Sequence, residues 1–446
     1  MPLRLRNLSV ETMMTSRRAL IFLLCLLSVT LASCTSKSGG GGGARLRVLN
    51  AIPDASAISL TLDTNAPIVT GLAFQQMTQY IDVGSGSHEF KVSANGGASN
   101  VIDTTLNLGG ADYTYVVYGP VSAAVGGLFA DTGFATPTSG NFSVRFINSA
   151  AGVGAIDLYL TAAGIDLNTT SATVSNIGYG SASAFTAVPT GIYELRVTAA
   201  NTKDVIYDTG TAAFGEQTLK DIVAFTKGSS KLVQVAVLNI DSTGTGKVND
   251  NLLAEFKVVN ASSVGSPLNV AVDGTLTLSN VPYTGVSNYT KVSAGSRTFT
   301  VQATITPGAN LLTLVNTLAP ATDTSLVLSG PAGALLPLVL QDNNLPPPVG
   351  RARLRFVNTS ADFPSLDVYV NFSKQVSSLT TQSASPYLEV TADPTIGTSY
   401  EFDFNTAGTV TPVLKLIGVS IIAGHTYTVY VVGPAAAPVG VVSKDD

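Results

Sequence analysis

Chemistry needs particular residue types, and this chain of 446 residues supplies few of them. It has two histidines, His88 and His425, and two cysteines, Cys25 and Cys34. The stretch beginning at His88 reads HEFKV, so Val92 stands where the second histidine of an HExxH zinc site belongs. G-x-S-x-G, the turn that carries the serine of many hydrolases, is absent from the sequence. The sequence predicts no enzyme, no cofactor and no metal site.

The stretch from Asp241 to Asp250, DSTGTGKVND, contains a Gly-Lys pair that invites comparison with a phosphate-binding loop. Asp241 stands where the loop needs its first glycine, and Val248 where it needs Ser or Thr. We therefore expect a linker between two folded units. Calcium held by Asp241, Asn249 and Asp250 is the alternative, although their spacing is not that of an EF-hand.

Two Asp-x-Tyr motifs are the strongest binding candidates: Asp157 with Tyr159, and Asp367 with Tyr369. Tyrosine beside an acid and a base is typical of sugar-binding surfaces, so a ligand site is one interpretation. The other, which we favour, is structural, with Arg145 facing Asp157 and Arg355 facing Asp367 as ion pairs across neighbouring strands.

These motifs belong to a fourfold repeat marked by an asparagine at Asn50, Asn148, Asn260 and Asn358, at intervals of 98, 112 and 98 residues. In each copy the residues four and two before the asparagine are apolar, and the residue between them is a base: Arg47, Arg145, Lys257 or Arg355. Alternation with period two predicts a strand with one buried face and the base on the other. Each copy continues with a second alternating strand, then an aromatic residue (Tyr80, Phe185, Tyr289 or Tyr387), and closes with a β-rich run.

A period of about 100 residues matches one β-sandwich. We predict an all-β protein of tandem Ig-like antiparallel β-sandwiches, with repeats at 44–136, 140–241, 251–344 and 350–446. Similar linkers follow the first and third repeats, DTGFATPTSG and DNNLPPPVG, which predicts that the repeats are grouped as one with two and three with four.

The first 33 residues have the pattern of a signal peptide. Arg17 and Arg18 precede an apolar run from Ala19 to Thr30, too short for a comfortable membrane span, and Met1, Met13 or Met14 is the start. The ending LASC resembles the lipobox of bacterial lipoproteins, which implies that Cys34 is acylated and becomes the N-terminus; a plain secretory signal is the alternative. Thr35 after the cysteine favours the outer membrane. Residues 34–43 then form a lipidated flexible linker rich in Gly and Ser.

The opening R-x-x-N-[AS], the D-x-Y, the run from Tyr179 to Val197 and the closing YT-V resemble domain of unknown function 4397, found in bacterial secreted and surface lipoproteins. The resemblance covers about Ala44 to the C-terminus, and repeats one and three depart from it at D-x-Y. It implies Ig-like sandwiches in tandem and brings no catalytic residues.

A net charge of −5 disfavours nucleic acid as a partner. The expected partner is the membrane, through the lipid anchor, with an unidentified protein or glycan beyond it. We therefore predict a non-enzymatic, lipid-anchored envelope protein that acts as a spacer, scaffold or adhesin. An array of carbohydrate- or peptidoglycan-binding modules is the alternative.

Overall fold

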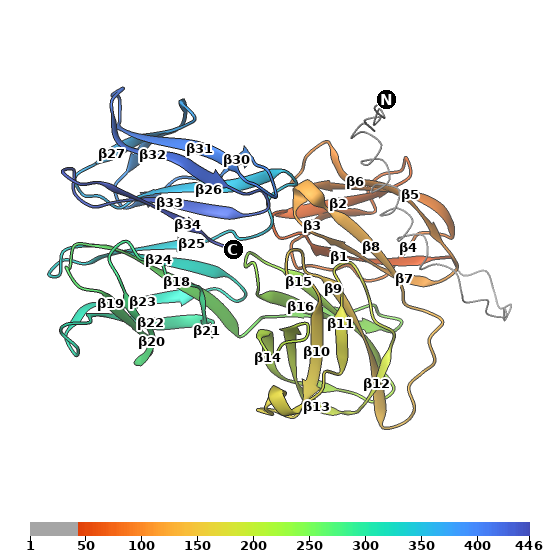
Figure 1. Cartoon of the computed structure of the whole chain (residues 1–446). Coiled ribbons are helices and arrows are strands. Elements are labelled where there is room, and N and C mark those ends of the chain that lie inside the picture. The colour runs from red at the N-terminus through yellow and green to blue at the C-terminus, as the bar shows by residue number, and fades with distance from the viewer. Residues whose placement is uncertain (1–42) are drawn as a thin grey trace, which may run out of the picture. The chain divides into compact units, whose positions relative to one another are not determined.

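The computed structural model describes residues 43–446, and the regular secondary structure of these residues is almost entirely strand, joined by turns and loops (Figure 1). The predicted signal peptide, Cys34 and nearly all of the linker lie outside this range. Between residues 43 and 446 we find no helix with the length and hydrophobicity needed to span a membrane.

The first two repeats each contain two sheets. In repeat one the first sheet has the order β4-β1-β7-β8 and the second β3-β2-β5-β6. In repeat two the orders are β12-β9-β15-β16-β17 and β11-β10-β13-β14. The elements are β1 (Arg45–Ala51), β2 (Ala57–Leu62), β3 (Val69–Ala73), β4 (Ile81–Asp82), β5 (Gly86–Ala94), β6 (Asn100–Leu108), β7 (Asp112–Tyr118), η1 (Val121–Ala123), β8 (Val125–Ala130), β9 (Asn141–Ser149), β10 (Ile156–Thr161), η2 (Leu167–Thr169), β11 (Val174–Ile177), β12 (Thr186–Pro189), β13 (Gly191–Ala199), β14 (Val205–Phe214), β15 (Leu219–Thr226), β16 (Val233–Ile240) and β17 (Gly246–Asn249).

The last two repeats follow the same plan. Repeat three has the orders β21-β18-β24-β25 and β20-β19-β22-β23, and repeat four has β29-β26-β33-β34, with β30 also on β26, and β28-β27-β31-β32. The elements are β18 (Leu253–Ser262), β19 (Leu268–Val272), β20 (Thr275–Val281), β21 (Thr290–Ser293), β22 (Gly295–Ala303), β23 (Asn310–Leu318), β24 (Asp323–Gly330), β25 (Leu336–Gln341), β26 (Arg351–Asn358), β27 (Ser365–Val370), β28 (Ser373–Thr380), β29 (Ser383–Ala384), β30 (Leu388–Thr391), β31 (Thr398–Thr406), β32 (Pro412–Ile421), β33 (Thr426–Val432) and β34 (Val439–Lys444).

The all-β sandwich class is confirmed, with one addition that the sequence did not predict. In every repeat the first strand runs parallel to the strand beside it: β1 to β7, β9 to β15, β18 to β24 and β26 to β33. After the opening strand the chain forms the second sheet, interrupted by one short strand (two in repeat four) that pairs antiparallel with the opening strand in the first sheet. It then returns to the first sheet, and the returning strand can run in the same direction as the opening strand. The other pairings are antiparallel.

The core of each repeat lies between its two sheets. The apolar residues on either side of the base in the opening strand are fully buried in all four copies: Leu46 and Val48, Val144 and Phe146, Phe256 and Val258, and Leu354 and Phe356. They pack against the alternating apolar residues of the second strand, such as Ile58 and Leu60 in repeat one. Burial of each large side chain contributes about 1.5–3 kcal/mol, which makes these positions the main stabilising contacts of each sandwich.

The other face of each opening strand is covered as well, because the repeats pack in pairs. Leu49 of β1 and Val116 of β7 share a hydrophobic cluster with Ile147 of β9 and Val223 of β15. Val259 of β18 and Val357 of β26 belong to the corresponding cluster of repeats three and four. The pairing is therefore one with two and three with four, as the linkers predict. We refer to these units as pair 1–2 and pair 3–4.

The segment after repeat two is more than a linker. Residues Gly246–Asn249, within the phosphate-loop-like stretch, form β17 and extend the first sheet of repeat two along β16. Asp241, before this strand, closes a turn by accepting hydrogen bonds from the amides of Thr243 (2.8 Å) and Gly244 (3.1 Å). In residues 43–446 no three His, Cys, Asp or Glu side chains gather as a metal site would need, so the alternative of a calcium ion here has no such cluster behind it.

The recurring asparagine fastens the two sheets of each repeat together. Asn148, fully buried, donates from Nδ2 to the carbonyl oxygens of Gly154 (2.8 Å) and Ile177 (2.9 Å), and its Oδ1 accepts from the amide of Ala150 (3.0 Å). Ile177 belongs to β11 in the opposite sheet. Asn50, Asn260 and Asn358 make the same inter-sheet bond to Leu72, Val281 and Leu379. The sequence identified these four asparagines by their spacing, and the structure shows that each one links the two sheets of its repeat by hydrogen bonds.

Replacement of Asn148 by alanine should therefore destabilise the chain by about 2–4 kcal/mol, because the buried amide of Ala150 and two partly buried carbonyl oxygens lose their hydrogen-bond partner. Denaturant unfolding of the purified chain measures this change. Asn107 is exposed on β6, so Asn107→Ala is the matched control and should have little effect. Equal stability of the two variants would contradict a stabilising role for the hydrogen bonds of Asn148 between the two sheets.

Candidate functional site

The four bases of the opening strands are buried, although the sequence placed them on a polar face. Arg47, Arg145, Lys257 and Arg355 are 0, 6, 1 and 3% exposed. Because the two repeats of a pair meet across this face, the sheet of one repeat covers the base of the other. A charge buried in this way needs a partner, and its partners define the most elaborate polar site of the described chain.

The recurring aromatic residue is the first partner of each base. The distances from the cation to the ring centroid are 5.0 Å for Arg47 over Tyr80, 5.1 Å for Arg145 over Phe185, 4.8 Å for Lys257 over Tyr289 and 4.9 Å for Arg355 over Tyr387. A cation over a ring face is attracted by the π-electrons, most strongly where water is excluded. The sequence identified both positions in every repeat without connecting them.

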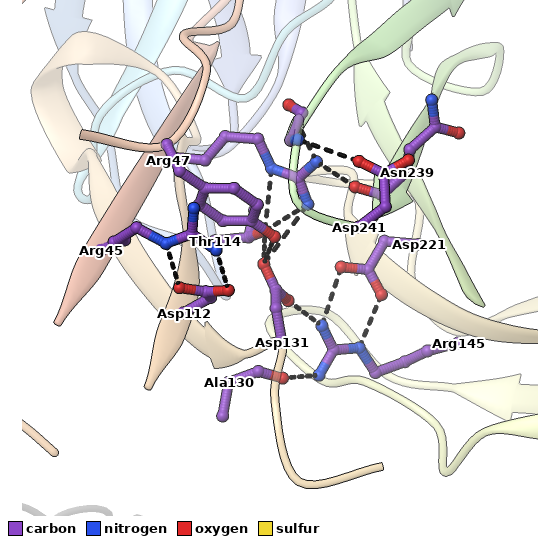
Figure 2. Close-up of polar contacts among 12 residues, drawn as sticks. Arg45, Arg47, Asp112, Thr114, Ala130, Asp131, Arg145, Asp221, Asn239 and Asp241 are labelled. Carbon is purple, nitrogen blue, oxygen red and sulfur yellow. Dashed lines mark hydrogen bonds and ion pairs between the residues drawn. The ribbon is translucent and has the colours of Figure 1, made fainter. Parts of the chain in front are cut away.

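In pair 1–2 the bases meet two acids, and we name Arg47, Asp131, Arg145 and Asp221 the buried cluster (Figure 2). The Arg145 guanidinium donates from Nε and Nη2 to the two oxygens of Asp221, both at 2.7 Å, and from Nη2 to Asp131 at 2.8 Å. Arg47 lies 3.3 Å from the other oxygen of Asp131. Asp131 of repeat one thus holds a base from each repeat.

Backbone and hydroxyl groups complete the buried cluster. Arg47 donates to the carbonyl oxygen of Asn239 in repeat two at 2.7 Å and to the Thr114 hydroxyl at 2.7 Å. Arg145 donates to the carbonyl oxygen of Ala130 in repeat one at 2.7 Å (Figure 2). Each arginine therefore reaches into the other repeat of its pair.

Pair 3–4 repeats the arrangement with a reciprocal exchange. Lys257 of repeat three pairs with Asp445 of repeat four, and Arg355 of repeat four pairs with Asp342 of repeat three at 2.6 Å. Asp342 also accepts hydrogen bonds from the hydroxyls of Tyr289 and Ser325. Each repeat supplies a base to its partner and receives one in return.

Pair 1–2 departs from this exchange in one respect. In the strand register, the position of Asp131, Asp342 or Asp445 is occupied in repeat two by Ile240, the last residue of β16, and Asp241 comes one residue later. Repeat two instead has Asp221, opposite Arg145 on the neighbouring strand, where the others have Thr114, Ser325 or Thr428. In repeat two the acid, Asp221, therefore lies on β15 and still contacts the base, Arg145. Sequence reasoning missed these acids, although an aspartate directly follows each of the strands β8, β25 and β34.

The predicted ion pairs of Arg145 with Asp157 and of Arg355 with Asp367 are wrong. The two members lie in different sheets of the sandwich: Arg145 on β9 and Asp157 on β10, Arg355 on β26 and Asp367 on β27. Between the first and second strands of each repeat the chain crosses from one sheet to the other, so these two strands do not pair. The bases turn toward the neighbouring repeat, and the acids remain within their own second sheet.

Each acid of the Asp-x-Tyr motifs binds backbone amides. Asp157 accepts from Asn176 (2.7 Å) and Asn201 (3.2 Å), and Asp367 accepts from Ser378 (3.0 Å) and Gly408 (3.1 Å). Asn176 and Ser378 have φ values of 57° and 55°, in the left-handed region, at an irregularity of the next strand.

In the two repeats that lack the motif, other residues accept the hydrogen bond from the corresponding backbone amide. Ser59 of repeat one accepts from the amide of Gly71 (3.2 Å), and Asn269 of repeat three accepts from Asn280 (2.8 Å). Gly71 and Asn280 again have positive φ, 62° and 59°. A shared structural task therefore explains the polar residue at this position in all four repeats.

The tyrosines of the motifs differ in exposure. Tyr159 is only 2% exposed, with the ammonium group of Lys203 at 4.8 Å from its ring centroid and 2.8 Å from its hydroxyl. Tyr369 is half-buried, with Lys374 at 5.6 Å from its ring centroid. Neither ring is the open platform that a sugar-binding surface would present. Ligand binding by Asp157, Tyr159, Asp367 and Tyr369 stays a prediction.

Asp367 makes stability depend on pH. The ammonium group of Lys374 and the amide of Ser378 lower the pKa of this carboxyl to about 2. A lowered pKa means that the stabilisation is complete above the ordinary value near 3.8 and is lost as the pH falls toward 2. We expect Asp367→Asn to flatten the loss of stability between pH 4 and 2, measured by thermal unfolding. Asp103, exposed on β6, offers the control Asp103→Asn, which should leave that loss intact.

The histidines lie apart, in repeats one and four. His88 on β5 is half-buried and lies 2.9 Å from Asp63, and His425 lies 3.0 Å from Asp446. Among the described residues neither imidazole has a hydroxyl within hydrogen-bonding distance, so no serine is placed for activation by either one. Each histidine side chain is partly covered by its aspartate.

Comparison with known proteins adds a family. The model of the family described as "Domain of unknown function (DUF4397)" matches residues 44–159, 254–369 and 352–446. No curated protein matches the chain.

Among solved structures, the Bacillus anthracis TIE protein is similar over 85% of this chain and 69% of its own, at 11% identity and a TM-score of 0.15. A structure titled for alpha-glucan recognition by family 41 carbohydrate-binding modules from streptococcal virulence factors covers 47% of this chain and 97% of its own, at 11% identity and a TM-score of 0.17. Such low scores carry no functional argument.

Proposed function

The chain belongs to the family of domain of unknown function 4397, and from that premise we propose that it is a non-enzymatic, lipid-anchored protein of the bacterial envelope that acts as a spacer, scaffold or adhesin. One observation carries the proposal: the polar residues common to the repeats are used to hold repeats together. The bases of the opening strands and their acids lie at the contact between repeats, and the Asp-x-Tyr acids support turns.

This arrangement suits a mechanical role. Buried ion pairs contribute little net stability but fix which groups must meet, and breaking one is costly. Two repeats joined in this way keep one orientation, unlike beads on a flexible chain. Repeated modules also multiply weak contacts, so a surface built from them can adhere through avidity.

The anchor is the part of the proposal that rests on the sequence. Two or more acyl chains on Cys34 would give stable membrane attachment, whereas one gives marginal binding. The Gly-rich linker up to Gly43 would separate the repeats from the lipid surface. The outer membrane remains the proposed location.

We expect Cys34→Ser to move the chain from the membrane fraction to the soluble fraction of the producing bacterium, because the thiol that carries the lipid is gone. Cell fractionation with metabolic labelling by a palmitate analogue measures both location and acylation. Cys25→Ser is the matched control and should remain labelled and membrane-bound. Labelling that persists in Cys34→Ser would contradict the anchor.

The role itself is tested in a strain that lacks the chain. The wild-type chain should restore attachment of cells to a surface or resistance of the envelope to detergent, and Cys34→Ser, expressed at the same level, should restore neither. Full restoration by the unanchored chain would overturn the proposal, because a spacer or adhesin works only from a fixed point. Protease treatment of intact cells then tells whether the repeats face outward.

A further inference from the structure

The two pairs differ at the turn that contacts the recurring asparagine. In each repeat the recurring asparagine accepts, at its backbone oxygen, a hydrogen bond from one turn amide: that of Gln75, Gly180, Thr284 or Gln382. The residues just before these amides are therefore equivalent. They are Phe74, Tyr179, Tyr283 and Thr381, so repeat four alone lacks an aromatic ring at this position.

In pair 1–2 both of these rings pack onto a ring of the other repeat. Tyr179 of repeat two meets Tyr118 of repeat one edge-on, with ring centroids 5.4 Å apart. Phe74 of repeat one meets Phe225 of repeat two at 6.0 Å. The two ends of the contact between repeats are therefore closed by aromatic pairs.

Pair 3–4 keeps neither aromatic pair: Val432 stands where repeat two has Phe225, and the pair of Tyr118 and Tyr179 is replaced by two small hydroxyl residues. The strand registers place Ser329 where repeat one has Tyr118, and the turn places Thr381 where repeat two has Tyr179. The two phenol rings are thus absent, and their space is only partly taken by Gln382, which stands where repeat two has Gly180 and donates to the Ser329 hydroxyl. Beside this space a cleft of about 290 Å³ opens between repeats three and four, and both Ser329 and Thr381 line it.

The rest of the cleft combines one aromatic ring with polar and apolar groups. Tyr283 forms part of the wall of the cleft and is 42% exposed. Its hydroxyl packs so closely on Gly433 of repeat four that a Cβ atom on that residue would lie only 2.8 Å from it. The Asp362 carboxylate uses one oxygen to accept from the amide of Ala435 at 2.8 Å, and the described residues place no donor on the other. Leu336, Pro331 and Pro434 add apolar surface.

We propose that this cleft binds a saccharide ring. A pyranose has an apolar C–H face and a rim of hydroxyls, which matches an exposed tyrosine ring beside a carboxylate and hydroxyl groups. A phenylalanine side chain from a partner protein would fill the same volume but has no donor for Asp362, and tyrosine or tryptophan has one, whereas a sugar presents several hydroxyls around its rim; this favours the sugar. The binding site is thus formed by the contact of repeats three and four, away from the Asp-x-Tyr motifs.

The inference deepens the adhesive form of the proposed function by giving it a ligand class, and it rests on that function only for its biological meaning. Binding is measured with the purified chain from Thr35 onward, free in solution. Failure to bind therefore bears on the cleft alone, and failure of the Cys34→Ser experiment bears on the anchor alone.

The experiment uses chemical-shift or saturation-transfer NMR with maltohexaose, cellohexaose, N-acetylglucosamine tetramer and, as an aromatic probe, p-cresol, each at millimolar concentration. The key variant is Thr381→Tyr, which returns a ring to this position. Thr381→Ser is its matched control, because serine can keep the hydrogen bond from Thr381 Oγ1 to the Ser360 carbonyl oxygen (2.8 Å). Tyr283→Ala removes the ring of the wall, with Tyr179→Ala, equally exposed at 42%, as its control.

We expect at least one oligosaccharide to bind, with at least tenfold weaker binding to Thr381→Tyr and Tyr283→Ala and unchanged binding to both controls. If Thr381→Tyr fails to fold, the comparison of Tyr283→Ala with Tyr179→Ala decides. Absence of binding by all three oligosaccharides, binding that survives both key variants, or binding of p-cresol alone would each overturn the proposal, and the last would point to an aromatic side chain of a protein.

Discussion

Replacement of Asp131 by asparagine is expected to lower the free energy of unfolding of pair 1–2 by about 3–5 kcal/mol, the cost of removing one partner from a buried ion pair. The Asp131 side chain is fully buried between Arg47 and Arg145, whose side chains are 0 and 7% exposed. Without its charge the buried cluster keeps two cations and only the Asp221 carboxylate. The excess positive charge has no water to stabilise it.

The loss should fall on the contact between repeats one and two, because Asp131 belongs to repeat one and Arg145 to repeat two. Denaturant unfolding measures the size of the effect, and hydrogen exchange of β1, β9 and β15 shows where it occurs. Asp112→Asn is the matched control: Asp112 pairs with Arg45 at a surface where the side chains are 18 and 33% exposed, so its loss should cost about 0–1 kcal/mol. Similar effects of both substitutions would contradict a special role for the buried cluster.

Raising the pH through neutrality is expected to destabilise the junction of repeats two and three. Glu255 on β18 and Asp323 on β24 lie directly opposite each other and are 1 and 0% exposed. Oε2 of Glu255 and Oδ1 of Asp323 are buried and have no hydrogen-bond partner among the described residues, so a negative charge on either one is poorly compensated. Burial and the neighbouring carboxyl raise the pKa of Asp323 to about 7, and burial raises that of Glu255.

The direction follows from proton binding. A carboxyl with a raised pKa in the folded state binds more protons when folded, so its stabilising contribution is complete below the ordinary value near 3.8 and is lost as the pH rises through about 7. A shift of roughly 3 units corresponds to about 4 kcal/mol as an upper limit. Asp323 accepts from the Asn344 side chain (2.7 Å) and the Ser230 amide of repeat two, and Lys231 and Lys291 oppose the shift of Glu255.

Asp323→Asn tests this prediction, because an amide occupies the same space without a charge. The wild-type chain should lose stability between pH 5 and 8, and the variant should lose much less and be the more stable of the two at pH 8. Thermal unfolding across this range measures both curves. A wild-type chain whose stability is flat across it would show that the two carboxyls are ionised together at no cost.

Much of the fold could be predicted from the sequence because its signals are local. Alternation around Arg47, Arg145, Lys257 and Arg355 marks the opening strand and its core side, and the spacing of Asn50, Asn148, Asn260 and Asn358 gives the repeat. Period-two alternation follows from strand geometry alone, so no tertiary information is required. The linkers after the first and third repeats predicted the pairing for a similar reason, because repeats that follow the same plan have matching connections.

The candidate site was only half predictable. The sequence identified the bases and the recurring aromatics, and it assigned the wrong acids to Arg145 and Arg355. Its assumption was that strands adjacent in sequence are adjacent in a sheet. Here β9 and β10 belong to opposite sheets, and the partners of β9 are β12 and β15, both farther along the chain. Sheet membership depends on how the chain crosses between layers, which a local pattern does not record.

By itself, then, the sequence determined an all-β chain of four sandwiches, the residues of each core and the positions that carry charge. Only the tertiary structure decided what those charges do. The alternation of apolar and polar residues shows on which side of a strand a base lies, but it does not show what covers that side. The cover is a second repeat, and it turns an apparently exposed base such as Arg47 into a buried one that needs Asp131. The packing of repeats also decided where a cleft opens. Tyr179 packs on Tyr118 of the other repeat, whereas Thr381 and Ser329 at the corresponding positions line a cleft, and this difference depends on two residues from different repeats.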